Sequence, residues 1–246
     1  NLGRGQLPRP EVVTATALAT GRHDSRWVEV RGIVRSAAAA SPTSPTGRGL
    51  SVQLRSEGKD LLLVVDNYAP ASTNLVDAEV AVRGVAAGVF SWQRQLLEPV
   101  VAVESDANIE VTRPPPPLDS LPVKTIQSLF RYAPDGFPEH RVRLQGQLLG
   151  RQAGRWLAVR DATSGLLVES PGSEDLAAGD EIELIGFPEM REHTLWLVKP
   201  IVRKLGNGPP AAPIVSSVTN AFRHPCELHR IEGTLVGPPR PGEGSW

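Results

Sequence analysis

The sequence predicts an all-β protein with a few short helices, built from small five-stranded barrels repeated along the chain. Apolar and polar residues alternate in several short segments, which is the pattern of strands with one buried and one solvated face. One such segment, with a glycine in its middle, occurs three times: RWVEVRGIV at 26–34, HRVRLQGQL at 140–148 and LHRIEGTLV at 228–236. Recurrence of this kind indicates a tandem array of similar units.

The glycines of the repeated segment are expected to bend it. Gly32, Gly146 and Gly233 each lie between apolar residues that are two positions away on either side. A glycine inside a strand permits a bulge or a sharp bend. We therefore expect each segment to be a curved first strand that serves both halves of a small barrel.

Further matching segments give the order of the unit. RWLAVRDATSGLLVES at 155–170 is interpreted as a second strand, a polar turn and a third strand. AEVAVRG at 78–84 matches DEIELIG at 180–186 as a fourth strand ending in glycine, and EPVVAV at 98–103 matches KPIVRK at 199–204 as a fifth. Five strands in this order predict a partly open Greek-key barrel, the OB-fold.

Prolines indicate the boundaries between units. We expect a first OB-like barrel with an N-terminal segment in 1–112, a proline-rich linker in 113–121, a second OB-like barrel in 122–206, and a linker with the start of a truncated third OB-like unit in 207–246. Four consecutive prolines, 114–117, favour a stiff connector. A short helical segment is expected before each first strand. It is clearest at 122–132, where Ile126, Leu129 and Phe130 share a face and are expected to close a barrel end.

Composition narrows the classes of function. The 246 residues include 26 Lys and Arg against 27 Asp and Glu, a net charge of -1. This balance removes the electrostatic signature of a dedicated nucleic-acid binder, so no nucleic-acid partner is expected. The single cysteine, Cys226, excludes an intrachain disulfide. No apolar stretch approaches the roughly 20 residues that span a bilayer.

Motifs of catalysis and metal binding are missing from the sequence. It contains no Walker loop, paired CxxC, HExxH or GxSxG motif, so we predict no enzyme, no catalytic residue and no cofactor. His224, Cys226 and His229 lie close together, but zinc normally takes four ligands and no fourth is evident, so no metal site is predicted. A solvated link before a strand is expected to carry four acidic residues: Glu174, Asp175, Asp180 and Glu181.

Aromatic and charged residues in the expected loops between the fourth and fifth strands, together with a tryptophan on a second strand, are the candidates for ligand binding, because OB barrels often use this loop. The candidate residues are Phe90, Trp92 and Arg94 in the first unit and Trp156, Arg191 and His193 in the second. The ligand is left open as a small molecule, a peptide or a protein. The alternative also stays open that these aromatic side chains cap a barrel mouth or pack on a neighbouring unit.

Several of these segments resemble a known family of modules. The segments 22–36, 74–96, 128–146, 155–170 and 176–206 are similar to the repeated OB-type modules in the extracytoplasmic region of bacterial sensor histidine kinases and related membrane signalling proteins. The resemblance implies a non-catalytic sensory or interaction module in the periplasm, with a homodimer possible in the parent receptor. Membrane attachment and any kinase activity would then belong to parts of the protein outside this chain.

A second reading of the same barrels is a cytoplasmic tandem OB-fold protein that binds single-stranded nucleic acid. Such proteins stack bases on aromatic side chains beside a cationic groove, and Phe90, Trp92 and Arg94 form the patch that best fits this use. The neutral charge, the few aromatic residues and the family resemblance favour the sensory module over this alternative.

Overall fold

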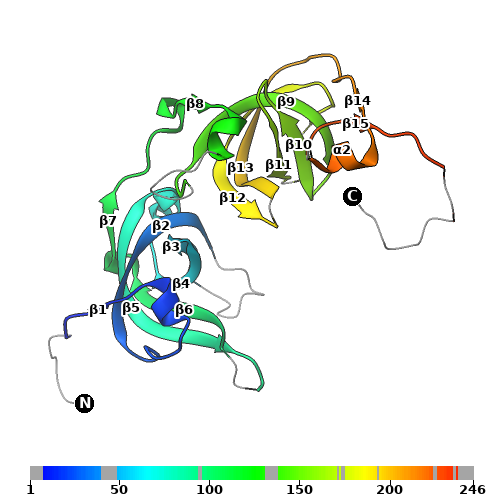
Figure 1. Ribbon diagram of the computed structural model, residues 1–246. Coiled ribbons are helices and arrows are strands. Elements are labelled where there is room, and N and C mark those ends of the chain that lie inside the picture. The colour runs from blue at the N-terminus through cyan, green and yellow to red at the C-terminus, as the bar shows by residue number, and fades with distance from the viewer. Residues whose placement is uncertain are drawn as a thin grey trace. The chain divides into compact units, whose positions relative to one another are not determined.

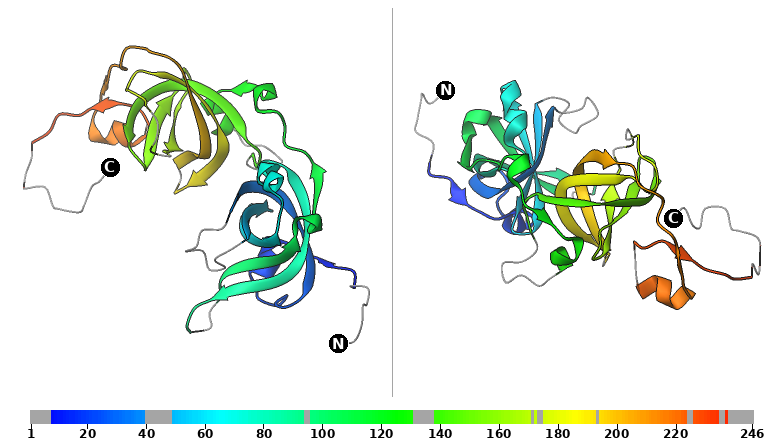
Figure 2. Two further views of the ribbon diagram at one scale, coloured as in Figure 1. Left: turned by 180° about the vertical axis from the view of Figure 1, so that it is seen from behind. Right: turned by 90° about the horizontal axis from the view of Figure 1, so that it is seen from above.

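A computed structural model describes residues 8–39, 49–93, 96–130, 138–170, 172, 175–192, 194–223, 226–234 and 237. The chain divides into two compact units, the first made of residues 1–122 and 135–143 and the second of residues 123–134 and 144–246. In each unit the strands curve around one closed barrel (Figures 1 and 2). Residues 138–143 group with the first unit, although β9, the first strand of the second barrel, begins at Val142.

The first barrel contains five long strands: β2 (Trp27–Ala39), β3 (Leu50–Ser56), β4 (Lys59–Asn67), β5 (Glu79–Phe90) and β6 (Leu96–Ser105). They are hydrogen-bonded in the order β2-β3-β4-β6-β5, and pairing between β2 and β5 closes the ring. The β4–β6 pair is parallel, while the other pairs of the ring are antiparallel. This is the Greek-key order of an OB barrel.

The second barrel repeats this topology with β9 (Val142–Gln152), β10 (Trp156–Arg160), β11 (Gly165–Glu169), β12 (Glu181–Arg191) and β13 (Thr194–Gly206). Its order is β10-β11-β13-β12-β9, closed by pairing of β10 with β9. The predicted fold class, tandem five-stranded OB-type barrels with short helices, is therefore confirmed. Both fourth strands continue beyond the glycines, Gly84 and Gly186, at which we expected them to end.

The remaining elements are short. They are β1 (Glu11–Val12), α1 (Ala15–Leu18), β7 (Ile109–Arg113), β8 (Val123–Lys124), β14 (Ile214–Val215), α2 (Val218–Arg223), β15 (His229–Arg230) and the 3-10 helices η1 (Pro70–Leu75), η2 (Asp106–Asn108), η3 (Leu118–Ser120) and η4 (Ile126–Phe130). The four prolines at 114–117 have no regular secondary structure and lie between β7 and η3.

The first strand of each barrel bends at its glycine, as predicted. Strand β2 pairs with β5 up to Ile33 and with β3 from Ile33 onward, so it changes partners beside Gly32. A Cβ atom at Gly146 would lie 2.5 Å from the carbonyl oxygen of Arg160, and Gly32 faces the carbonyl of Arg55 in the same way. Only glycine allows the two backbones to approach this closely.

Each barrel has an apolar core formed by the inward-facing residues, which occur at alternate positions along each strand. Val28, Val30 and Val34 of β2 are fully buried, as their alternation predicts. The second barrel buries the corresponding positions of β9 and also Phe187, the largest side chain among its fully buried residues. The outward positions are thereby left for solvent or ligands.

Short helical segments close one end of each barrel. In the first unit, Thr14 accepts a hydrogen bond of 3.1 Å from the Ala17 amide, and Leu18 of α1 is buried. In the second unit, Ile126 and Leu129 of η4 are buried, but Phe130 is 47% exposed, so its predicted role in the plug is wrong. A 3-10 helix has three residues per turn, so positions 126 and 129 align while 130 turns away.

The C-terminal segment repeats the start of the first barrel. Strand β14 pairs in parallel with β15, and α2 lies between them in the sequence, as β1 and β2 pair in parallel around α1. Beyond β15, residues 231–234 form no strand and Ile231 is 45% exposed, so the long third strand expected here is not formed in the described residues.

One of the four acids assigned to a solvated link is buried. The Asp180 carboxylate accepts a hydrogen bond of 2.8 Å from the Ala177 amide and lies 2.7 Å from the Lys204 ammonium. These two contacts lower the pKa of Asp180. The prediction is wrong for Asp180 because these partners compensate for its desolvation. Asp175 and Glu181 are exposed, and Glu174 lies outside the described residues.

Candidate ligand-binding groove

The outer face of the second barrel carries a groove of about 730 Å³. Inward positions of β10, β11 and β13 are filled by fully buried residues such as Leu157, Val168 and Leu197. Side chains at the alternate positions therefore point out of the barrel. The groove is lined by Gly154, Arg155, Trp156, Leu167, Glu169, Ser170, Arg191 and Trp196.

Two tryptophans and a leucine form the apolar part of this groove. Leu167 of β11 pairs with Trp196 of β13 in parallel register, and Trp156 of β10 pairs with Glu169 of β11. Trp156, Leu167 and Trp196 are partly exposed, although large aromatic side chains are usually used for burial. An accessible surface with two indoles is therefore available to a planar apolar ligand.

Arg191, at the end of β12, is held over one of the indoles. Its Cζ atom lies 5.3 Å from the centroid of the Trp196 ring. Nη2 donates to Glu169 Oε1 over 2.8 Å, and Nε donates to Glu189 Oε1 over 3.3 Å. Burial alone would lower the pKa of Arg191, but the hydrogen bonds to Glu169 and Glu189 raise it above its ordinary value. The guanidinium thus stays charged in a fixed plane.

Glu169 is held from two sides. Its Oε1 atom accepts from Arg191, and its Oε2 atom accepts a hydrogen bond of 3.0 Å from the backbone amide of Lys199. The Glu169 side chain nevertheless remains 36% exposed at the groove. A carboxylate oxygen can accept more than one hydrogen bond, so Glu169 retains accepting capacity toward a ligand.

The structure brings two of the sequence candidates into this groove, Trp156 and Arg191. His193 lies outside the described residues. Trp196, Leu167 and Glu169 also line the groove and were not predicted from the sequence. The alternation in TLWLV at 194–198 would have placed Trp196 on the outer face, because Leu195 and Leu197 on either side of it point inward.

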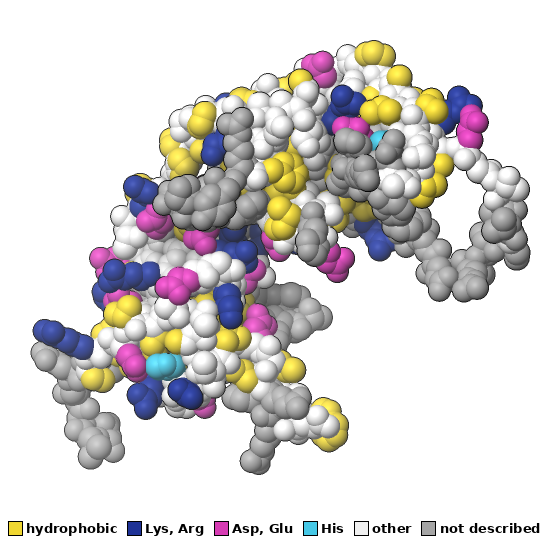
Figure 3. All heavy atoms as spheres, in the orientation of Figure 1, with side chains coloured by type: hydrophobic (Ala, Val, Ile, Leu, Met, Phe, Trp, Pro, Cys, Tyr) yellow, Lys and Arg dark blue, Asp and Glu magenta, His cyan; other side chains and the backbone are white. Residues whose placement is uncertain are grey.

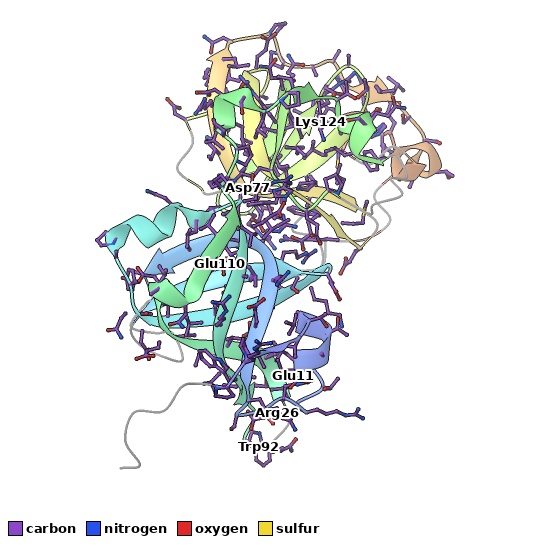
Figure 4. All side chains as sticks on the ribbon, turned by 90° about the vertical axis from the view of Figure 1, so that its left-hand side faces the viewer. Glu11, Arg26, Asp77, Trp92, Glu110 and Lys124 are labelled. Carbon is purple, nitrogen blue, oxygen red and sulfur yellow. The ribbon has the colours of Figure 1, made fainter. Side chains whose placement is uncertain are left out.

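The candidates of the first unit do not form a comparable groove in the described residues. Trp92 lies in the turn between β5 and β6 and is 90% exposed (Figure 4). Arg94 lies outside the described residues, as does the side chain of Phe90. Arg55 of the first barrel corresponds to Arg160 of the second, because the carbonyl of each lies against the glycine of the first strand. In this alignment Ser51 corresponds to Trp156, and Val100 corresponds to Trp196. The first barrel therefore has no tryptophan at either of these two positions.

The His and Cys residues near the C-terminus give no metal centre within the described part of the chain, where no group of three or more His, Cys, Asp or Glu is suitably placed. Burial raises the pKa of the Cys226 thiol to about 11. The Nδ1 atom of His229 lies 3.0 Å from the Ser216 hydroxyl. His224 lies outside the described residues.

The fold is that of a protein with tandem OB-type barrels. No protein-family model matches the sequence, and no curated protein matches it. Among solved structures, similarity is found to the p204 HINb domain, with 10% identity over 71% of this chain and 95% of that chain and a TM-score of 0.30. A murine DNA-binding protein bound to double-stranded DNA has 13% identity over 72% and 98% of the two chains, with a TM-score of 0.32. The Ifi202 HINa domain in complex with 20-bp double-stranded DNA has 8% identity over 72% and 95%, with a TM-score of 0.30.

These comparisons correct the predicted class. The extracytoplasmic module of a sensor histidine kinase, its periplasmic location and the exclusion of nucleic acid are wrong: the three matching structures named above are HIN or DNA-binding proteins. Two of the five segments that carry the resemblance contain Gly32 and Gly146, which the geometry of the barrel itself requires. Among the described residues no helix is long and apolar enough to cross a bilayer.

Proposed function

We propose that the protein binds single-stranded nucleic acid through the groove of the second barrel. The observation that carries this proposal is the pair of accessible tryptophans, Trp156 and Trp196, on the outer face of β10, β11 and β13. OB barrels bind oligonucleotides on the face of their second and third strands, between the loops that follow the first and fourth strands. The groove occupies this position, because Gly154 and Arg155 precede β10 and Arg191 ends β12.

The chemistry of the groove favours unpaired bases over a duplex. A base stacks on an indole through its flat face, which is free in a single strand and covered by neighbouring pairs in a duplex. Arg155 and Arg191 are the basic residues that line the groove, and guanidinium groups bind phosphate oxygens through charge-assisted hydrogen bonds. Stacking is worth about 1–3 kcal/mol per base, so two indoles supply most of the affinity.

Charge explains why the sequence did not point to this function. On the face seen in Figure 3, Lys and Arg side chains are interspersed with Asp and Glu side chains. Two groove arginines, one of them paired with Glu169 and Glu189, give a small electrostatic contribution. The near-neutral net charge is therefore compatible with a protein that holds bases more strongly than phosphates.

Weak salt dependence is a direct prediction of such binding. With two arginines at the phosphates, the slope of log K against log salt concentration is expected to be about -1.4 for a single strand. Fluorescence anisotropy titrations of a labelled oligothymidylate at several KCl concentrations measure this slope. A slope steeper than about -4 would mean that the backbone is held by many more cations than the groove contains.

The main test removes the indoles one at a time. Trp156→Ala and Trp196→Ala are each expected to weaken binding of an oligothymidylate of about eight nucleotides by about tenfold or more, since each removes one stacking surface. Trp196→Phe is expected to retain most of the affinity because it keeps an aromatic face. Anisotropy gives the dissociation constants, and thermal melting confirms that each variant is folded.

Trp92→Ala is the matched control. This variant also removes an exposed indole, but from the first barrel, so binding of the short oligonucleotide is expected to be unchanged. The proposal fails if the unmodified protein does not bind the short strand, or if Trp156→Ala and Trp196→Ala bind it as the unmodified protein does.

A further inference from the structure

We propose that the groove selects guanine over the other bases, with Glu169 and Arg191 as the specificity-determining residues. This inference rests on the proposed function, because it concerns the base that stacks in the same groove. It is carried by the hydrogen-bonding groups that lie beside the indoles: a partly exposed carboxylate and a guanidinium held in a fixed plane.

The Glu169 carboxylate provides two acceptors at the groove. Each of its oxygens accepts one hydrogen bond from the protein, Oε1 from Arg191 and Oε2 from the Lys199 amide. Each oxygen therefore keeps accepting capacity. Guanine is the base whose pairing edge carries two adjacent donors, N1–H and the N2 amino group. A carboxylate can accept both in parallel, as it accepts the forked donors of arginine.

Arg191 supplies the complementary donor. Its Nε and Nη2 atoms are engaged by Glu189 and Glu169, whereas none of the described residues accepts a hydrogen bond from Nη1. The guanidinium plane is fixed over Trp196, so little side-chain freedom is lost when Nη1 binds a ligand. Guanine O6 lies on the same side of the base as N1–H, and arginine is a frequent donor to guanine O6.

The other bases match this arrangement less well. Thymine and uracil present one N–H between two carbonyl oxygens, and at least one of these oxygens would face the carboxylate. Adenine and cytosine each offer one amino group on this edge, so they can make one of the two hydrogen bonds. A good bidentate contact discriminates against the wrong base by about five- to 150-fold in affinity.

The test uses an oligothymidylate of about eight nucleotides with one central position changed to guanine, inosine, adenine or cytosine. The guanine strand is expected to bind about tenfold more tightly than the all-thymine strand. Inosine lacks the N2 amino group and should lose most of this gain. The comparison uses the unmodified protein, so it does not depend on the folding of any variant.

Glu169→Gln adds a test of the residue. An amide offers one acceptor in place of two, so the affinity for the guanine strand relative to the all-thymine strand is expected to fall to within about twofold. Glu189→Gln is the matched control, because Glu189 also binds Arg191 but does not line the groove, and it should keep the preference.

The outcomes separate the two proposals. If all five strands bind equally and Trp196→Ala still weakens them, the guanine inference is overturned and single-strand binding stands. If guanine is preferred but Glu169→Gln preserves the full preference, the assignment of Glu169 is overturned. If none of the strands binds, single-strand binding itself fails.

Discussion

Replacing Gly146 by alanine is expected to destabilise the second barrel by about 1–3 kcal/mol, the cost of forcing extra volume into a packed site. The added Cβ would lie 2.5 Å from the Arg160 carbonyl oxygen and 2.9 Å from a methyl carbon of Val159. Neither neighbour can move freely, because the first is backbone and the second is a fully buried core side chain. The bend that lets β9 pair with both β10 and β12 would therefore be strained.

Gly150→Ala, in the same strand, is the matched control. No atom of the described residues lies within 4 Å of a Cβ placed there, and its φ is not in the left-handed region. This variant should be neutral or stabilise the barrel by up to about 1 kcal/mol, because alanine restricts the unfolded chain. Urea unfolding followed by tryptophan fluorescence and circular dichroism measures both variants. Equal stabilities for the two would mean that the close approach at Gly146 does not determine the bend.

The strand pattern predicted the barrels because a barrel imposes local rules on its sequence. Inward positions must be apolar at every second residue, and a first strand that pairs on both halves needs a glycine where the backbones meet. Val28, Val30 and Gly32 follow these rules within five residues of sequence. Such rules define the fold. Because any OB-type barrel obeys them, they could not identify the family, and the resemblance to modules of sensor histidine kinases was wrong.

The groove could be predicted only in part, because it depends on register between distant strands. Trp156 and Arg191 were found as an aromatic and a cation near expected loops. The contacts of Glu169 with Arg191 and with the Lys199 amide join β11, β12 and β13 and span up to 30 residues. Trp196 meets Leu167 only through the parallel pairing of β11 with β13. No local pattern specifies that pairing.

Asp161→Ala is expected to cost about 2–4 kcal/mol of stability, because it removes a carboxylate that joins two elements of the second barrel. Its Oδ1 atom accepts hydrogen bonds from the Thr163 amide (2.7 Å), the Thr163 hydroxyl (2.6 Å) and the Ser164 amide (2.9 Å) in the β10–β11 turn. Its Oδ2 atom accepts from the Ile126 amide over 2.7 Å, at the start of the helix η4. Alanine would leave these donors without their acceptor and free the segment that closes the barrel.

The pH dependence of the loss of stability distinguishes the contribution of the Asp161 charge from that of the shape of its side chain. Burial works to raise the pKa of Asp161, but the hydrogen bonds from Thr163, Ile126 and Ser164 outweigh it and lower the pKa. A carboxyl group with a lowered folded pKa contributes stability that is complete above its unfolded pKa, about 3.9, and is lost as the pH falls through the folded value. The stability difference between the unmodified protein and Asp161→Asn should therefore be constant from pH 7 to about pH 5 and shrink below about pH 4.

Asp175→Asn, at an exposed aspartate of the same barrel, should leave stability near neutral pH within about 0.5 kcal/mol of the unmodified protein. Urea unfolding of the three proteins at pH 3 to 7 gives the comparison. A difference for Asp161→Asn that stays constant down to pH 3 would show that the Asp161 side chain acts by shape alone. A difference that shrinks would show that the negative charge of Asp161 holds the β10–β11 turn to η4, so acid should loosen the closed end of the barrel first.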